Sequence, residues 1–255
     1  MQSYDLMKKI ENFFYHVGRY LIFIRKIFAK PEKTKPYFSQ IVREFDKIGL
    51  DSLPIVFLVS LFMGAVITLQ SGINLTNPII PREYISYGAR DAIILEFAST
   101  MIALILAGKI GANITSELGT MRISQQIDAL EMMGVNSAGY LVLPKLVATV
   151  VFFPIFNAFS IIIGLLGGWL IAYSTNLVNI EVYQDGLHLY FESYYVFYSQ
   201  VKTVVFGIII TTISSYLGYY VEGGAVEVGK ASTNAIVFTS IIILLFNVAI
   251  TSLML

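Results

Sequence analysis

The stretch LVLPKLVATVVFFPIFNAFSIIIGLLGGWLIAY, from Leu141 to Tyr173, decides the fold class of this protein. A helix needs about 20 mostly apolar residues to cross the hydrocarbon core of a bilayer. This stretch is longer than that and contains one charged residue, Lys145. Pro154, Asn157 and a few glycines are too weak a turn signal to divide it into a hairpin. We therefore expect one long transmembrane helix that can kink at its proline.

Four further stretches have the same apolar character: Leu53–Leu69, Ala92–Gly108, Val201–Val221 and Ala235–Leu255. Of the 255 residues, 56% are hydrophobic and 13% are charged, and that charged fraction is about half of what soluble domains carry. This composition argues against a soluble enzyme and against a disordered regulator. The sequence therefore predicts an all-α integral membrane protein with five transmembrane helices.

The residue types present also argue against several kinds of site and partner. The 17 basic residues only balance the 17 acidic ones, which argues against binding to nucleic acid. The chain has no cysteine for disulfides or thiolate metal sites, and only two histidines, His16 and His188. It also lacks paired intramembrane aspartates and the HExxH pattern, so an intramembrane enzyme has no support. We expect no catalytic residue, metal site or cofactor in this chain.

The distribution of Lys and Arg predicts the orientation, because positive residues are retained on the cytoplasmic side. Ten of them lie in the first 50 residues. The connections on the same side add four: Lys109, Arg122, Lys145 and Lys230. The connections on the other side hold three: Arg82, Arg90 and Lys202. We therefore expect a cytoplasmic amino terminus and a periplasmic carboxyl terminus.

Residues 1–50 are predicted to form amphipathic helices ahead of a single transmembrane domain over residues 51–255. Apolar residues recur at helical spacing between basic ones: Phe13, Val17, Tyr20, Leu21, Ile24 and Phe28. This pattern is typical of a helix lying in the headgroup plane of a membrane. Such a helix either serves only as an anchor or also packs on a partner, and the two readings are evenly balanced. A second short helix is expected to end at Ile48, before Pro54 opens the first span.

Glu96 is the most informative single residue, because it lies about two turns into the second predicted span. An ionised carboxylate is costly there unless it faces protein or water, so a functional role is the first interpretation. The alternative is that the span begins later and that Glu96 lies at the outer interface, near Arg90 and Asp91.

Small residues recur every four positions in two spans: Ala103, Ala107 and Gly111, then Gly164 and Gly168. This spacing lets two helices approach closely. Packing within the chain is the commoner explanation, and a homodimer face is the second.

The connection after the second span, about residues 113–140, has the pattern of a helix. Its apolar stripe is formed by four residues: Ile123, Ile127, Leu130 and Met133. Gly134 supplies a helix stop. The polar face carries more acidic than basic side chains, which favours docking into a groove on another protein over resting on the membrane. A nearby match to a nucleotide-binding P-loop, GAVEVGKA over residues 224–231, lies between two spans and lacks the final Ser or Thr, so we do not expect the chain to hydrolyse ATP.

Two longer stretches resemble a known family. The run AGKIGANITSELGTMRISQQIDALEMMGVN, Ala107 to Asn136, followed by YLVLPK, Tyr140 to Lys145, resembles the signature of the MlaE (YrbE-like) permease family. The run GGAVEVGKASTNAIV, Gly223 to Val237, resembles the last inner loop and following span of that family.

The resemblance implies an ABC-transporter permease of the bacterial inner membrane that works as a homodimer. A separate cytoplasmic ATPase would bind ATP and Mg²⁺ and receive the inner connecting helix. An MCE-domain protein would associate on the periplasmic side, and phospholipid would move between the inner and outer membranes. The alternative is a non-conducting scaffold that holds the ATPase and the MCE-domain protein together.

The same resemblance implies which residues carry these roles. The ATPase-coupling residues would be Glu117, Arg122, Gln126, Asp128, Leu130, Glu131 and Gly134. The lipid cavity would be lined by Glu96, Phe97 and Met101. The chain departs from the family where Glu96-Phe97-Ala98-Ser99 replaces Glu-Leu-Gly-Pro, and where Asn247 replaces a frequent Asp. The aromatic-rich outer segment from Tyr183 to Tyr198 either anchors at the interface or marks a lipid portal.

Overall fold

The computed structural model describes residues 2–29, 34–75, 79–175 and 178–255, and over these residues it contains helices and no strands. Five helical runs are long and apolar enough to cross a membrane, which confirms the predicted fold class. They are Tyr37–Asn74, Glu83–Ile123, Ser137–Thr175, Ser193–Tyr219 and Ala225–Met254. Each run extends beyond the apolar stretch that predicted it at one end or both, because polar residues continue the helices past the hydrocarbon core.

The first two spans are assembled from several helical segments. In the first, α2 (Thr34–Glu44) continues through the short stretches η1 (Phe45–Gly49) and η2 (Leu50–Ser52) into α3 (Leu53–Asn74). The expectation of a separate helix ending at Ile48 is therefore wrong. The second span comprises α4 (Glu83–Ala92), the π-helical η3 (Ile93–Met101), α5 (Ile102–Leu106), the π-helical η4 (Ala107–Gly111) and α6 (Ala112–Ile123). Stretches of π-helix inside α-helices occur frequently at functional sites.

The remaining spans are continuous helices. The third is α8 (Ser137–Thr175), one helix that includes Pro144 and Pro154, as its sequence predicts. The fourth is α10 (Ser193–Tyr219) and the fifth is α11 (Ala225–Met254). Two short helices complete the order: α7 (Gln126–Met132) between the second and third spans, and α9 (Ile180–His188) between the third and fourth.

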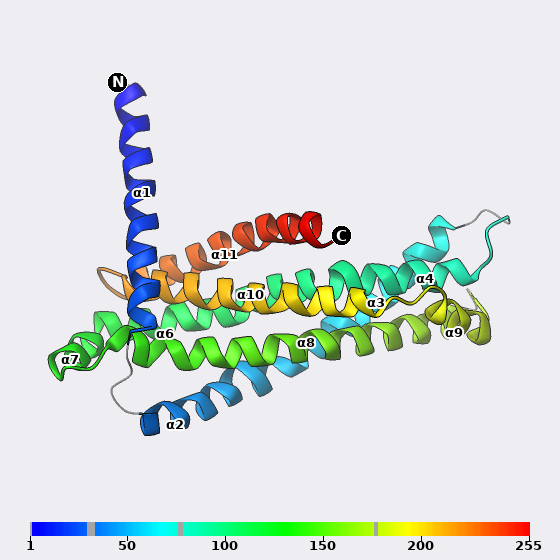
Figure 1. The fold of residues 1–255 in the computed structure, drawn as a ribbon, viewed down its shortest axis with the longest axis horizontal. Coiled ribbons are helices and arrows are strands. Elements are labelled where there is room, and N and C mark those ends of the chain that lie inside the picture. Colours follow the sequence, from blue (N-terminus) through cyan, green and yellow to red (C-terminus); the bar gives the residue numbers. More distant parts are fainter. Residues whose placement is uncertain (1, 30–33, 76–78, 176–177) are drawn as a thin grey trace.

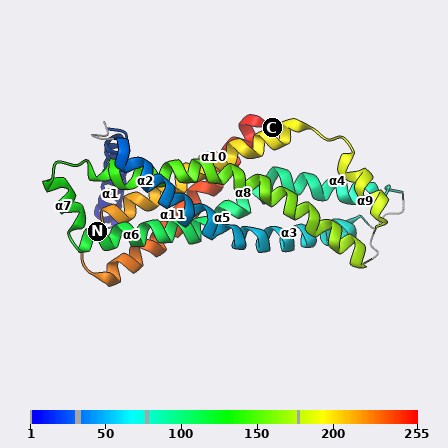
Figure 2. The same ribbon diagram turned by 90° about the horizontal axis from the view of Figure 1, so that it is seen from below.

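The spans run side by side along the longest direction of the molecule (Figures 1 and 2), with α8 packed against both α3 and α10. The helix α7 lies at one end and α9 at the other. Glycines make the closest packing possible, because a Cβ atom on Gly64 would overlap the backbone of Gly164, and one on Gly167 would overlap Leu61. The small residues singled out in the sequence, Ala103, Ala107, Gly111, Gly164 and Gly168, are all buried within the single chain.

The amino-terminal helix α1 (Gln2–Ile27) crosses the end of the bundle instead of running along it (Figure 1). Phe23 and Ile27 are fully buried against the bundle, and the Tyr20 hydroxyl donates a hydrogen bond to Thr212 over 2.8 Å. Of the predicted apolar stripe, three side chains instead face outward: Val17, Leu21 and Phe28. The Phe13 side chain lies outside the described residues. The helix thus has one apolar face that packs on its own bundle and a second that is exposed. The predicted stripe combined residues from both faces.

Candidate functional site

An ion pair between two spans forms the centre of the candidate site. Glu96 lies on the π-helical stretch η3, and Lys202 lies on α10, where its Nζ is 3.0 Å from Glu96 Oε1. The ammonium group also donates to the Tyr198 hydroxyl over 3.1 Å and to the Leu95 carbonyl over 3.2 Å. All three of its protons therefore have acceptors, which a lysine buried in a membrane protein needs.

The fifth span completes the cluster from the other side of Glu96. The Asn247 side-chain amide donates to Glu96 Oε2 over 3.0 Å. The Thr100 hydroxyl lies 3.2 Å from the same oxygen and 3.0 Å from Asn247 Oδ1, so its single proton can serve either acceptor. Thr251 bridges back to α10, because its hydroxyl lies 2.6 Å from that of Tyr198. Three spans thus converge on one carboxylate.

The asparagine explains one departure from the family pattern. An amide can donate a hydrogen bond to the Glu96 carboxylate, whereas an ionised Asp could not and would add a second negative charge. With Asn247, the charges of Glu96 and Lys202 balance each other. The substitution keeps position 247 in the polar cluster while leaving the cluster electrically neutral.

The two partners of the ion pair differ in their exposure. The Lys202 side chain is completely buried, whereas 41% of the Glu96 side-chain surface is accessible in the single chain. A carboxylate exposed to acyl chains would be strongly unfavourable. The accessible side of Glu96 therefore requires a polar group opposite it when the protein is in a membrane. This arrangement is suited to binding a polar or charged group of a ligand within the span.

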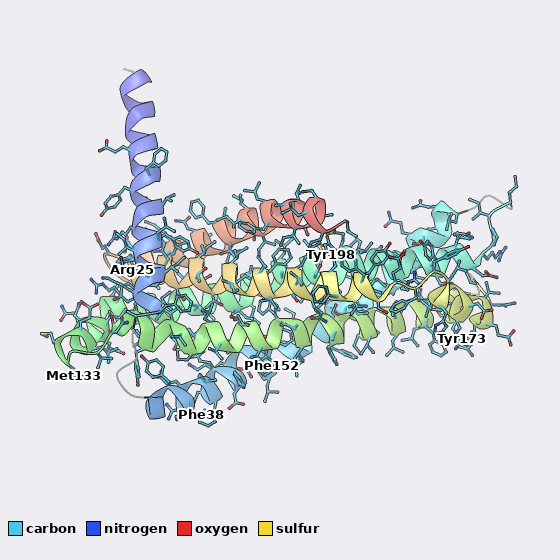
Figure 3. The ribbon with its side chains drawn as sticks, in the orientation of Figure 1. Arg25, Phe38, Met133, Phe152, Tyr173 and Tyr198 are labelled. Carbon is cyan, nitrogen blue, oxygen red and sulfur yellow. The ribbon has the colours of Figure 1, made fainter. Side chains whose placement is uncertain are left out.

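Sequence reasoning missed Lys202, which is the second residue of the predicted span Val201–Val221 but was counted with the connection before it. The structure shows that α10 begins at Ser193, eight residues before the predicted start, so Lys202 lies well inside the helix and not at its edge. The missed signal was its helical spacing from Tyr198, four residues earlier on the same face, together with the need of Glu96 for a cation. Tyr198 is fully buried on the half of α10 nearer α9 (Figure 3). With Lys202 inside the span, Arg82 and Arg90 remain of the three basic residues that were predicted on the outer side.

The other two predicted lipid-cavity residues, Phe97 and Met101, line a different space. It lies between the second span and the helices α3 and α8, and Gly64 and Gly164 also border it. Its volume is about 10 Å³, which is about the space of one water molecule. A single chain therefore forms no lipid-sized cavity at Phe97 and Met101.

The predicted coupling residues are brought together at the opposite end of the molecule. Gln126 and Leu130 on α7 and Glu117 on α6 line a cavity of about 430 Å³ that α2 and α8 close. Glu117 also joins a charge network, because the buried Lys145 lies 2.9 Å from Glu117 and 2.7 Å from Glu44 of α2. The ends of three spans, at the end of the molecule where α7 lies, are thus connected through one lysine.

The carboxylates of the coupling segment have partners within the chain. Arg122 forms an ion pair with Asp128 over 2.6 Å, across the turn between α6 and α7. Glu131 accepts a hydrogen bond from the Tyr219 hydroxyl over 2.7 Å. Hydrogen bonds from Tyr219 and Ser137 hold the pKa of the Glu131 carboxyl below its usual range. Asp128 and Glu131 remain partly or largely exposed, but their carboxylates are engaged within the chain.

Two methionines provide most of the exposed apolar surface of α7. Met132 is 87% exposed and Met133 is 68% exposed, and Met133 lies at the extreme end of the molecule (Figure 3). Ile127 is instead fully buried and fixes the opposite face of α7 to the bundle. Gly134, with φ at +79°, ends the helix as its sequence predicts.

The aromatic-rich outer segment divides into buried and exposed parts. Tyr183 on α9 and Tyr198 on α10 are fully buried, so neither contributes to an exposed aromatic surface. Four aromatic side chains between them are exposed: Tyr190, Phe191, Tyr194 and Phe197. The segment is held to α4 by the buried Arg90, which donates to the carbonyls of Leu187 and Leu189 over 2.7 and 2.8 Å.

Comparisons with known proteins agree with this architecture. A family model described as permease MlaE matches residues 41–253. A probable ABC transporter permease protein of Rickettsia bellii is 35% identical over 93% of this chain and 91% of its own length. A probable ABC transporter permease protein of Synechocystis is 30% identical over 84% of this chain and 81% of its own length. The intermembrane phospholipid transport system permease protein MlaE of Haemophilus influenzae is 27% identical over 98% of this chain and 95% of its own length. The chain therefore belongs to the MlaE family of ABC transporter permeases.

Proposed function

We propose that this permease moves phospholipids between the inner and outer membranes of a double-membraned bacterium, from a position in the inner membrane. The half-exposed carboxylate of Glu96, held by the buried Lys202, is the observation that carries the proposal. A lipid has an apolar body and a polar head, so its path needs an apolar wall with a few polar groups. The name of the Haemophilus relative, an intermembrane phospholipid transport permease, points to the same cargo.

A second copy of the chain would complete the lipid site. The space at Phe97 and Met101 holds about 10 Å³, whereas ligand sites need several hundred Å³. The helix α11, which carries Asn247 to the cluster, is the least buried of the five spans. Its exposed face is a row of large apolar residues: Val237, Phe238, Ile241, Leu244, Leu245 and Val248. Two such faces opposite each other would enclose an apolar cavity with Glu96 at its wall.

A separate cytoplasmic ATPase would supply the energy and hold the ATP and Mg²⁺. Because Asp128 and Glu131 have partners within the chain, we assign the contact with the ATPase chiefly to Met132 and Met133. Flexible apolar methionines adapt well to grooves on partner proteins. ATP-driven closure of two ATPases would then move the two α7 helices, and the spans would convey that movement to the lipid cavity.

At the other end, a periplasmic MCE-domain protein would receive or deliver the lipid. The four exposed aromatic residues that follow α9 and begin α10 would contact such a partner: Tyr190, Phe191, Tyr194 and Phe197. In this scheme the orientation is the one that the distribution of Lys and Arg predicts, with the amino terminus in the cytoplasm.

The test is a tagged purification in mild detergent, followed by mass spectrometry of the co-eluting proteins and lipids. We expect an ATPase, an MCE-domain protein and stoichiometric phospholipid with the unaltered chain. Glu96→Gln should retain both proteins and lose most of the phospholipid, whereas Glu181→Gln, on the exposed side of α9, should retain all three. Recovery of both proteins without lipid would support the scaffold alternative, and recovery of neither would refute the transport proposal.

A further inference from the structure

Three helices meet at a single carboxylate at the end of the bundle near α7. Glu131 Oε1 lies 2.7 Å from the Tyr219 hydroxyl and 2.9 Å from the Ser137 hydroxyl, and the two hydroxyls lie 2.7 Å apart. Glu131 is on α7, Ser137 is the first residue of α8, and Tyr219 is the last residue of α10. The two hydroxyl protons are shared among three short contacts. Together they fix α7 to the ends of two spans, and we call these three residues the junction.

Two of the three junction residues are buried, whereas Glu131 is exposed. Tyr219 and Ser137 are 3% and 2% exposed, and a hydrogen bond to a charged group is worth more than one between neutral groups. The Tyr219 ring also packs against Phe23 of α1, with ring centroids 5.2 Å apart. The junction is therefore a firm attachment of α7 to α10, and it is braced by the amino-terminal helix.

The other polar attachment of α7 does not reach the fourth span. The ion pair between Arg122 and Asp128 joins α6 to α7, and its two side chains are 33% and 46% exposed. It shapes the turn, where Gln125 adopts a φ of +58°. An exposed pair of this kind contributes little to stability. Over the part of the chain that the structure describes, the junction is thus the hydrogen-bonded route from α7 to the helix that carries Lys202.

The helix α10 connects the junction to the ion pair without a proline. It runs as one α-helix from Ser193 to Tyr219, and Tyr219 lies 17 residues beyond Lys202, a distance of about 25 Å along the axis. Its buried residues face several neighbouring helices, among them α6, α8 and α11. Because a continuous helix resists bending, a displacement at Tyr219 would be passed along the axis and would shift Lys202 relative to Glu96.

We propose that Tyr219 is a positioning residue that couples movement of α7 to the Lys202–Glu96 pair through α10. This inference rests on the proposed function in one respect, because it takes α7 to be the element that the ATPase displaces. The attachment itself is a property of the permease alone. Loss of the Tyr219 hydroxyl would leave α7 able to bind the ATPase but unable to pull α10.

The variant Tyr219→Phe removes the hydroxyl and keeps the ring. Tyr220→Phe is the matched control, because Tyr220 is the next residue and packs by its ring against Phe23 and beneath the guanidinium of Arg19. Glu131→Gln is a second variant that removes the charge of the junction. All three keep the side-chain volume almost unchanged, so the fold is expected to persist.

The first measurement is hydrogen exchange of the full-length permease in nanodiscs of phosphatidylethanolamine and phosphatidylglycerol, without a partner. Tyr219→Phe and Glu131→Gln should each speed amide exchange about tenfold in α7 and in the last turn of α10. Loss of one hydrogen bond to a charged group changes an equilibrium constant by about tenfold. Tyr220→Phe should leave both unchanged. Unchanged exchange in either helix of Tyr219→Phe would overturn the inference.

The second measurement uses the complex with its ATPase in vesicles of the same lipids, with labelled phosphatidylethanolamine as the transported probe. Tyr219→Phe should retain the ATPase and hydrolyse ATP within about twofold of the unaltered complex, while lipid transferred per ATP falls about tenfold. An unchanged ratio would overturn the inference. If the unaltered complex transfers no lipid while the exchange result holds, the proposed function fails and the link between α7 and α10 stands.

Discussion

Replacing Lys202 with methionine is the sharpest probe of the buried ion pair. The change keeps a long flexible side chain but removes an ammonium whose three protons are accepted by Glu96, Tyr198 and the Leu95 carbonyl. Glu96 would then remain inside the span without a countercharge. Its remaining donors, at 3.0 Å and beyond, are neutral side chains.

The expected loss of stability follows from this geometry. Removing one partner of a buried ion pair destabilises proteins by about 3–5 kcal/mol, because the other charge is left uncompensated. Glu96 is 41% exposed and retains its neutral donors, so the lower end, about 3 kcal/mol, applies. For a chain of this length, that corresponds to a fall in the unfolding temperature of about 6–12 °C. Replacing both partners by apolar residues should recover most of the lost stability.

The assay is thermal unfolding of the purified permease in one detergent, for Lys202→Met and for Lys202→Met combined with Glu96→Leu. Lys230→Met is the control, because Lys230 is 70% exposed and lies 3.8 Å from its acidic partner Glu227, so its loss should change stability by less than about 1 kcal/mol. If Lys202→Met unfolds at the same temperature as Lys230→Met, the buried pair is not a coupled unit. A double variant that is less stable than Lys202→Met would show that the uncompensated charge of Glu96 is not the cause of the loss.

Three further outcomes are expected. Gly64→Ala should destabilise the bundle by about 1–3 kcal/mol through overpacking, because the added Cβ would overlap the backbone of Gly164. Gly108→Ala is the control and should not destabilise it, because the space around Gly108 is open. The measurement is the unfolding temperature of each variant. The pKa of the Glu131 carboxyl is lowered in the folded protein. The stability that Glu131 contributes is therefore present above its ordinary pKa of 4.5 and is lost as the pH falls through the lower folded-state pKa, because the unfolded state takes up the proton first. In Glu131→Gln, the unfolding temperature should depend less on pH between these two pKa values. Met132→Asp should abolish retention of the ATPase in a pull-down, whereas Ser124→Asp should not; retention by the Met132 variant would place the contact elsewhere.

The number of membrane spans and their helical type could be predicted because five apolar stretches of sufficient length leave few alternatives. Their ends could not be predicted, because polar residues extend the helices wherever tertiary contacts satisfy them. The start of α10 illustrates this: Ser193 and the aromatic residues after it begin the helix eight residues before Val201, so Lys202 lies inside the span and not at its predicted edge. A lysine inside a span is recognised only with its partner, and Glu96 lies 106 residues earlier in the chain.

The coupling segment shows a related limit. Its helical pattern and its glycine stop were readable, because both are local properties of the sequence. The roles of its carboxylates were not, because Asp128 and Glu131 can meet either a partner protein or the rest of the chain. In α1, similarly, Phe23 and Leu21 are both apolar, and periodicity alone does not say which of the two packs on the bundle.

The neutrality of the polar cluster has a consequence for the energetics of transport. A group with one net charge gains or loses about 2.3 kcal/mol for every 100 mV of membrane potential that it crosses. Glu96 and Lys202 carry opposite charges 3.0 Å apart, and Asn247 adds none. A rearrangement that moves this cluster along the membrane normal therefore does almost no electrical work. Movement of this cluster alone would cost the same energy at any membrane potential.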